Sequence, residues 1–392
     1  MRTEGDFIKI REWLLPLSWL YGLGVWIRSL LFKIGILKSR AFDIPIISVG
    51  NITVGGSGKT PHVEYLVELL KEDMKVAVLS RGYKRKSRGY VLADAQTPMP
   101  RIGDEPYQMK EKFTDVYVAV DRKRTRGICR LMEDKDTGDV DVILLDDAFQ
   151  HRYVKPGINI LLVDYHRLII YDKLLPAGCL RESQKGKERA DIVIVTKCPK
   201  DLRPMEYRVL TKAMQLYPSQ SLYFTSLEYS PMRQLFGEEE RDVDSLKTDE
   251  QVLLLTGIAS PKQLLHDLQI HTCNIQQMFY ADHHQFTAKD VRHINQHFAA
   301  IPQPKLIITT EKDAARLKYT KGLSDEVKQH LFVLPVHIRF MHGQEEFNNK
   351  IISYVQKNSR NSILVKAKDD HKSQNGHYPG NRTGTISFRN NR

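Results

Sequence analysis

The segment 50–61, which reads GNITVGGSGKTP, constrains the possible folds of this chain more than any other part of the sequence. It follows the apolar run 44–49, a predicted buried strand, and precedes a predicted helix over 61–71. Glycines allow backbone N–H groups to surround phosphate oxygens, and a helix N-terminus adds a favourable dipole. The segment therefore predicts a P-loop, with an ordinary glycine-rich turn as the alternative. Its expected nucleotide-binding residues are Thr53, Val54, Gly55, Gly56, Ser57, Gly58, Lys59 and Thr60.

Two side chains of this loop have defined chemistry in a P-loop. Lys59 would reach the β and γ phosphates, and the Thr60 hydroxyl would ligate Mg²⁺. The strict pattern has glycine where this chain has Thr53. A second apolar run, 141–145, ends in Asp146 and Asp147. Because ligands bind at the carboxyl ends of strands in open α/β sheets, either carboxylate could hold Mg²⁺ directly or through water.

Two subclasses of P-loop protein are disfavoured. A guanine-specific site usually has Asp at the fourth position of its late-strand motif, whereas the segment 196–199 reads TKCP. Partitioning and chaperone-type ATPases have a second lysine before the paired glycines, where this chain has Val54. A kinase with a small or lipid-like acceptor remains.

Apolar runs that alternate with helical segments predict an α/β fold with a parallel sheet. The chain length suggests about two domains. We expect a P-loop NTPase-like core and a second, smaller α/β lobe. The predicted strands are 44–49, 75–79, 140–145, 158–163, 191–195, 222–227, 252–256, 306–310 and 331–335. The expected organisation is an amphipathic membrane-associating helix in 1–40, the kinase core in 41–217, a linker in 218–250, the smaller lobe in 251–350 and a basic, disordered tail in 351–392.

The N-terminal segment carries all three tryptophans and no charge from Trp13 to Ile27. On a helix, Trp19 and Trp26 share one face, and Ser18 and Ser29 lie on an adjacent small and polar stripe. Aromatic residues beside such a stripe are typical of a helix lying in a membrane interface. The alternative is a terminal helix packed on the protein's own core. A clean membrane-spanning helix needs about 20 apolar residues, and Arg28 interrupts this stretch.

The formal net charge of +12 indicates an acidic partner such as a nucleotide, an anionic lipid, a phosphorylated metabolite or a nucleic acid. Most of the excess lies in 1–40 and 357–392, which weakens the case for nucleic acid, and we expect none. A cytosolic P-loop NTPase that binds nucleic acid stays as an alternative, as does a non-enzymatic nucleotide-binding scaffold. Four cysteines without a CxxC pair favour a reducing compartment over a disulfide-stapled or zinc-bound domain.

Several separated blocks resemble the tetraacyldisaccharide 4′-kinases, the lipid A kinases of Gram-negative bacteria. The resemblance spans about residues 10–345 and does not include the basic tail. Besides the P-loop, the blocks are Ser80–Tyr83, Gly103–Pro106, Val120–Arg122 with Arg126, Asp146–Arg152, Leu175–Gly178 with Leu180–Glu182, Gly257–Ala259, Asp282–His284 and Thr310–Asp313. Within this family Thr53 is not a departure.

The resemblance implies ATP-dependent phosphorylation of the 4′-hydroxyl of tetraacyldisaccharide 1-phosphate, which yields lipid IVA in lipid A biosynthesis. It implies a protein, expected to be a monomer, at the cytoplasmic face of the bacterial inner membrane, in contact with anionic lipid. It also implies a β-type linker that permits hinge motion between the lobes.

The resemblance further implies roles for individual residues. Asp104 would be the catalytic base, assisted by His283, with His284 as the rival histidine, and Glu182 would help to hold Mg²⁺. Because planar guanidinium groups suit phosphate oxygens, the arginines of these blocks are candidates for substrate or ATP phosphates. The expected substrate-binding residues are Arg81, Tyr83, Arg122, Arg126, Gln150 and Arg181.

Overall fold

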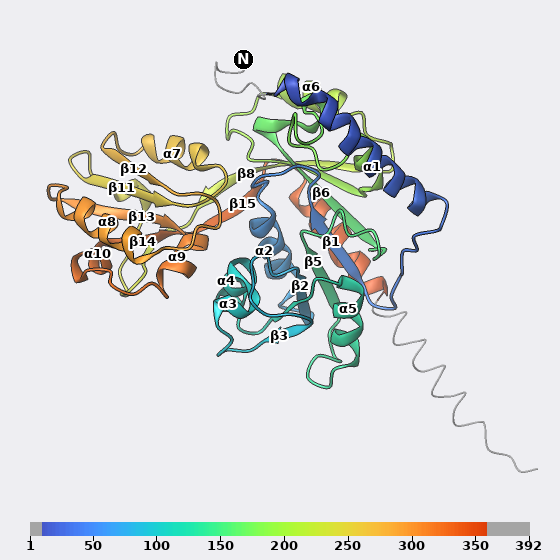
Figure 1. The fold of residues 1–392 in the computed structure, drawn as a ribbon, viewed down its shortest axis with the longest axis horizontal. Helices are drawn as coiled ribbons and strands as arrows, with labels where there is room; N and C mark the ends of the chain where they lie inside the picture. Colours follow the sequence, from blue (N-terminus) through green and yellow to red (C-terminus); the bar gives the residue numbers. More distant parts are fainter. Residues whose placement is uncertain (1–9, 359–392) are drawn as a thin grey trace, which may run out of the picture.

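The computed structural model describes residues 10–358, which form two α/β bodies joined by two crossings of the chain (Figure 1). The larger body contains a nine-stranded sheet with the order β15-β8-β7-β6-β1-β5-β2-β4-β3. Its interior pairs are parallel, and the edge pairs β3/β4 and β8/β15 are antiparallel. The α/β fold with a parallel core sheet and a smaller second lobe is therefore confirmed.

The strands of the larger sheet are β1 (Ile46–Gly50), β2 (Val76–Ser80), β3 (Val91–Ala93), β4 (Tyr117–Val120), β5 (Val142–Asp146), β6 (Ile158–Asp164), β7 (Ile192–Thr196), β8 (Ser221–Tyr229) and β15 (Val336–Phe340). The α-helices of this body are α1 (Leu15–Lys33), α2 (Lys59–Leu70), α3 (Met99–Ile102), α4 (Asp104–Lys112), α5 (Arg124–Glu133) and α6 (Pro204–Met214). Short 3₁₀ turns are η1 (Glu12–Leu14), η2 (Tyr165–Arg167), η3 (Ile169–Tyr171) and η4 (Gln184–Arg189).

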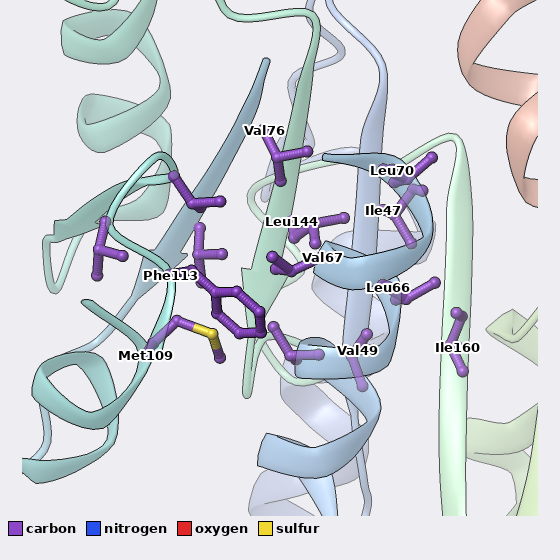
Figure 2. Close-up of a cluster of buried hydrophobic side chains, with 14 of the residues drawn as sticks. Ile47, Val49, Leu66, Val67, Leu70, Val76, Met109, Phe113, Leu144 and Ile160 are labelled. Carbon is purple, nitrogen blue, oxygen red and sulfur yellow. The ribbon is translucent and has the colours of Figure 1, made fainter. Parts of the chain in front are cut away.

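Helix α2 is held against the centre of this sheet by its apolar face. Leu66, Val67 and Leu70 are fully buried and pack against residues of β1, β5 and β6 (Figure 2). In the sheet, Ile47 is paired with Leu144 on one side and Val49 with Ile160 on the other. The P-loop between β1 and α2 is thus anchored at both ends by the most buried part of the molecule.

The smaller body contains a six-stranded sheet with the order β10-β9-β14-β13-β11-β12. Its strands are β9 (Met232–Gln234), β10 (Glu240–Arg241), β11 (Gln251–Thr256), β12 (Ile275–Phe279), β13 (Lys305–Thr310) and β14 (Leu331–Leu334). Its helices are α7 (Pro261–Gln269), α8 (Ala288–Ala299), α9 (Glu311–Leu317) and α10 (Asp325–His330), with the 3₁₀ turn η5 (Val243–Ser245).

The structure corrects the predicted linker over 218–250. Residues 221–229 are a strand of the larger sheet, and 232–234 pair with β14 of the smaller one. Met232 and Leu246 are buried in the smaller core. The polar composition of 231–248 hid these short edge strands, which need only alternate residues to face the core. The connection between the bodies is instead the antiparallel pair β8/β15, where Ser230 N–H donates to Pro335 O.

The predicted boundary at 350 also differs from the structure. Strand β15 returns to the larger sheet, and a helix over 344–358 follows it. Phe347, Ile351 and Val355 on this helix are buried in the same core cluster as α2. The apolar spacing of these residues outweighs the polar composition that predicted a tail from 351. The remainder of the predicted tail, from 359 onward, lies outside the described residues, as do residues 1–9 of the predicted N-terminal segment.

Helix α1 lies along the larger body on its small and polar stripe. The Ser18 hydroxyl donates to Leu174 O at 3.0 Å and accepts from Ala177 N–H at 2.9 Å. A Cβ atom at Gly22 would lie 2.9 Å from Leu174 Cδ1, so a larger residue there would displace that side chain. On the adjacent face, Trp19 and Trp26 are 71% and 60% exposed, and Trp13 of η1 is 77% exposed. One face of this segment therefore packs on the protein, as the alternative interpretation expected, and an apolar face stays exposed.

By length and composition, the segment Glu12–Lys33 could cross a membrane, with a mean hydropathy of 1.3 in its most apolar window. Contacts with the body at Ser18, Tyr21, Arg28 and Ser29 are distributed along the helix. The helix is therefore tethered to the larger body along its length.

The packing of the C-terminal helix gives a test of the corrected boundary. Replacing Ile351 with Ala should lower the free energy of unfolding by about 2–5 kcal/mol, because a fully buried side chain of the larger core is truncated. Gln356→Ala, at an exposed position of the same helix, should change it by less than about 0.5 kcal/mol. Urea unfolding midpoints measure both, and equal midpoints for the two variants would contradict the packing.

Candidate functional site

A cleft of about 1360 Å³ runs from the smaller body, past the P-loop, to helix α1. Its walls include Lys59 at the start of α2, Asp147 after β5, and Arg181 and Glu182 from the loop before η4. The smaller body contributes Asp282, His283 and Lys312, whereas α1 contributes residues from Tyr21 to Lys33. The carboxyl end of the parallel sheet therefore opens into one continuous groove.

The P-loop is shaped by local hydrogen bonds. Gly58 has φ +75°, a left-handed conformation that lets the chain turn into α2. The Asn51 amide donates to Ser57 Oγ at 2.8 Å, and Thr196 Oγ donates to Ser57 O at 3.1 Å. The Lys197 ammonium donates to Gly56 O and pairs with Asp164. The lysine of the TKCP segment thus supports the loop backbone, a role that the sequence did not reveal.

The predicted nucleotide-binding residues divide into three groups. Val54, Gly55, Gly56 and Lys59 line the cleft. Thr53 and Ser57 are buried and turn their hydroxyls toward Asn51, so their side chains belong to the scaffold. Gly58 provides the turn, and Thr60 lies in the first turn of α2.

The two aspartates at the end of β5 have opposite electrostatic environments. Burial raises the pKa of Asp146 to about 7, with the neighbouring Glu105 and Asp147 charges acting in the same direction. Burial also acts to raise the pKa of Asp147, but Lys59 and Arg181 outweigh it and lower that pKa. Lys59 Nζ lies 3.5 Å from Asp147 Oδ1, and Arg181 lies 3.7 Å from Oδ2. Asp147 therefore carries the stable negative charge.

These carboxylates fit a divalent cation. Asp146 Oδ1 is buried without a hydrogen-bond partner among the described residues, and Asp147 Oδ1 is buried with Lys59 Nζ 3.5 Å away. Ser80 Oγ donates to the other oxygen of Asp146 at 3.2 Å. Oxygen donors from one or two carboxylates, with waters and phosphates completing the shell, are the usual environment of Mg²⁺. Glu182 lines the same cleft, but both of its oxygens accept from Arg189, at 2.8 and 2.9 Å.

Asp104 and His283 come together although they are 179 residues apart. His283 Nδ1 lies 2.8 Å from Asp104 Oδ2, and the His283 ring packs on Tyr83 at 4.9 Å between centroids. Asp104 is 6% exposed at the first residue of α4, while His283 lies in the loop after β12 and lines the cleft. His284 instead bonds Asp290 and stacks on Tyr280. The geometry thus separates the two rival histidines.

Arg316 is a member of this cluster that the sequence reasoning missed. It lies on α9 of the smaller body, is 2% exposed, and donates through Nε and Nη2 to Asp104 Oδ2. Its Nη1 donates to Asp313 at 2.9 Å. Burial acts to raise the pKa of Asp104, but the hydrogen bond from His283 and the charge of Arg316 hold that pKa well below its usual range. Asp104 is therefore an ionised carboxylate. It accepts a hydrogen bond from the Nδ1–H group of His283.

Lys312 completes the polar cluster on the cleft side. Its ammonium lies 3.1 Å from His283 Nε2, 3.1 Å from Glu105 and 3.3 Å from Asp282. Since Nδ1 carries its proton toward Asp104, Nε2 is the acceptor of the pair and Lys312 donates to it. The Thr-Glu-Lys-Asp block that contains Lys312 had no assigned role from the sequence.

The predicted substrate-binding residues do not all reach the cleft. Arg81, Tyr83, Gln150 and Arg181 line it. Arg122 and Arg126 are absent from its walls, and Arg126 forms a bidentate pair with the buried Asp121, at 2.7 and 2.8 Å. In the part of the chain that the structure describes, no group of three or more His, Cys, Asp or Glu residues forms a separate metal site, including the Asp282–His284 block.

Comparison with known proteins places this arrangement in a family. Residues 10–356 match the family described as tetraacyldisaccharide-1-P 4′-kinase, LpxK. The tetraacyldisaccharide 4′-kinase of Phocaeicola vulgatus is 56% identical over 92% of this chain and 99% of its own length. The enzyme of that name from Bacteroides fragilis is 51% identical over 94% and 100% of the two chains.

A solved structure agrees with these sequence matches. LpxK from Aquifex aeolicus, in a crystal structure described as a complex with ATP, is 29% identical and has a TM-score of 0.68. The match covers 88% of this chain and 99% of that one. The family model and these relatives cover nearly the whole chain, so this chain is a member of the tetraacyldisaccharide 4′-kinase family.

Proposed function

We propose that this protein transfers the γ-phosphate of ATP to the 4′-hydroxyl of tetraacyldisaccharide 1-phosphate, the lipid IVA-forming step of lipid A biosynthesis. The carrying observation is that His283, which is bonded to the buried Asp104, and a P-loop lysine face one cleft. A phosphoryl donor and a hydroxyl acceptor could meet between them. Nucleic-acid binding, the alternative from the net charge, has no comparable support in the cleft.

His283 and Asp104 supply the proton chemistry in this proposal. Asp104 is buried and ionised, and its hydrogen bond fixes the Nδ1–H tautomer of His283. His283 Nε2 then accepts the proton of the acceptor hydroxyl, displacing the ammonium of Lys312. A base of this kind contributes about 10²–10⁴-fold to a reaction rate. The pair acts as a unit, with Asp104 orienting the imidazole and stabilising its charged form.

The opposite wall holds the phosphates. Lys59 and the backbone of residues 54–56 would surround the β and γ phosphates, and Arg81 and Arg181 would neutralise charge that develops during transfer. Asp146 and Asp147 would hold Mg²⁺, which would supply positive charge to neutralise the phosphates. Glu182, predicted as a further ligand, would have to leave Arg189 to join them.

Membrane association through α1 is part of the same proposal. The exposed tryptophans form an apolar face next to the stripe by which the helix is fixed to the larger body. Such a face favours peripheral or monotopic contact with the cytoplasmic surface of the bacterial inner membrane, close to a lipid acceptor. We also propose that the protein acts as a monomer.

A direct assay tests the activity. Purified protein with ATP, Mg²⁺ and tetraacyldisaccharide 1-phosphate in neutral detergent should yield a product with one added phosphate at the 4′ position, detected by mass and ³¹P NMR. Lys59→Ala should lower kcat by about 10²-fold or more, because a cation that stabilises the transferring phosphate is removed. Lys155→Ala, at an exposed lysine outside the cleft, should match the wild-type protein. An inactive wild-type protein would rule the proposal out.

The role of Arg316 predicts a change in pH dependence. Because Arg316 lowers the pKa of Asp104, Arg316→Gln should raise that pKa and move the acidic limb of the kcat–pH profile to higher pH. The loss of kcat should therefore be larger at pH 6 than at pH 8, and about 10-fold or more at the lower pH.

Arg316→Lys keeps the positive charge and serves as the matched variant. It should restore most of the acidic limb while the KM for both substrates stays near the wild-type value. A purely structural role for Arg316 would instead give the same fractional loss at every pH.

The membrane proposal predicts a loss of vesicle binding. Replacing both Trp19 and Trp26 with Ser should weaken co-sedimentation with vesicles that contain anionic lipid, because apolar surface and interfacial aromatics are lost. Ile270→Ser removes an equally exposed apolar residue from the smaller body and should leave binding unchanged. Full retention of the double variant on vesicles would assign membrane contact to another part of the protein.

A further inference from the structure

The end of the cleft that borders α1 contains cations without acidic partners. Arg28 and Lys33 of α1 and Arg152 of the larger body all line this region. None of the three forms an ion pair with an acidic residue among the residues described. By contrast, Lys59 and Arg181 face Asp147, Arg189 pairs with Glu182, and Lys312 pairs with Glu105. The α1 end therefore carries positive charge that no acidic side chain among the described residues balances.

Two of these guanidinium groups are held on one aromatic ring. The Cζ atoms of Arg28 and Arg152 lie 5.6 and 4.5 Å from the centroid of Phe32, which is buried and packs edge-on against Tyr153. Arg28 donates to Gln150 O at 3.1 Å, and Arg152 donates to Ser29 Oγ at 2.9 Å. Each arginine is thus positioned by a hydrogen bond to a neutral oxygen. A guanidinium group has five N–H donors, so other N–H groups of each arginine can bind a ligand.

Bringing two like charges to one ring is unfavourable unless an anion joins them. Burial, followed by the nearby charge of Arg189, lowers the pKa of Arg152, with Arg28 acting in the same direction and Glu182 opposing. A phosphate monoester would offset this repulsion between positive charges. The monoester carries close to two negative charges, and its oxygens can accept hydrogen bonds from two guanidinium groups at once.

We propose that Arg28 and Arg152, with Lys33 at the edge, bind the phosphate that the lipid acceptor already carries at its 1-position. This inference rests on the proposed function and adds a second anion subsite to it. The acceptor has its reacting 4′-hydroxyl on one sugar and its phosphate on the other. If the hydroxyl lies at His283, the groove leads the disaccharide toward α1, where the arginines meet the phosphate and the exposed apolar face can meet the acyl chains.

The subsite would make α1 a specificity element as well as a membrane contact. Arg28 is on α1, and Arg152 is six residues after Asp146, the last residue of β5. The two arginines therefore join α1 to the segment that follows β5. A phosphate held there would fix the register of the disaccharide in the groove and thereby place the 4′-hydroxyl. An acceptor without the phosphate would lose this alignment.

The test compares acceptors with and without the 1-phosphate in neutral detergent, where anionic phospholipid is absent. With the phosphorylated acceptor, Arg28→Gln and Arg152→Gln should each raise the KM for lipid roughly 10-fold or more, the usual effect of losing a charged hydrogen bond. The KM for ATP should not change. With the 1-dephospho acceptor, the wild-type protein should already show a raised KM, and the variants should match it.

Lys38→Gln, at an exposed lysine between α1 and β1 outside the cleft, is the matched control and should behave as wild type with both acceptors. Thermal unfolding of each variant identifies loss of folding. Since Arg28 is exposed on the helix surface, Arg28→Gln carries the test if Arg152→Gln fails to fold.

Three results would overturn the assignment. An equal increase of KM with both acceptors would show that the arginines do not sense the 1-phosphate. A raised KM for ATP would assign them to the nucleotide. An unchanged KM in detergent, combined with weaker binding to anionic vesicles, would assign the cluster to phospholipid headgroups. Failure of the proposed function itself would look different, because the wild-type protein would then phosphorylate neither acceptor.

Discussion

Asp104 and Arg316 are buried in different bodies of the molecule, and either charge without the other would be costly to hold away from water. Their ion pair therefore ties the assembly of the proposed base to the contact between α4 and α9. Two further interactions hold α4 and the end of α9 together. Lys318 pairs with Glu111, and the Tyr319 hydroxyl donates a hydrogen bond to the Tyr107 hydroxyl. His283 reaches Asp104 only when the two bodies meet in this way. The proton acceptor and the phosphate-binding loop can then face each other across one cleft.

The charge distribution along this cleft divides it by function. At the P-loop, cations are balanced by the aspartates after β5, which is suited to a donor that arrives with its own metal ion. Toward α1 the cations have no acidic partners, which is suited to a second anion on the acceptor. The net charge of +12 is thus less informative than the positions of the few arginines that remain unpaired inside the groove.

Local patterns predicted the central sheet and the P-loop because a buried parallel strand is a continuous apolar run and the loop is defined by adjacent glycines. Features made by distant segments could not be predicted in the same way. Strand β15 returns to the larger sheet 107 to 115 residues after its partners in β8, and nothing in either segment specifies the other. Arg316 lies one helical turn after Asp313, so a helix would place both on one face, but its contact with Asp104 spans 212 residues. Arg126 resembled a phosphate ligand by residue type, yet its partner is the nearby Asp121.

A double-mutant cycle on Asp104 and Arg316 tests the central claim, that Arg316 acts on catalysis through Asp104. The kcat values of Asp104→Asn, Arg316→Gln and the double variant would be measured at one pH with saturating substrates. If Arg316 acts through Asp104, the double variant should be no slower than Asp104→Asn alone, because the arginine then has no carboxylate to orient. Losses that multiply in the double variant would show that the two residues act independently and would contradict the account.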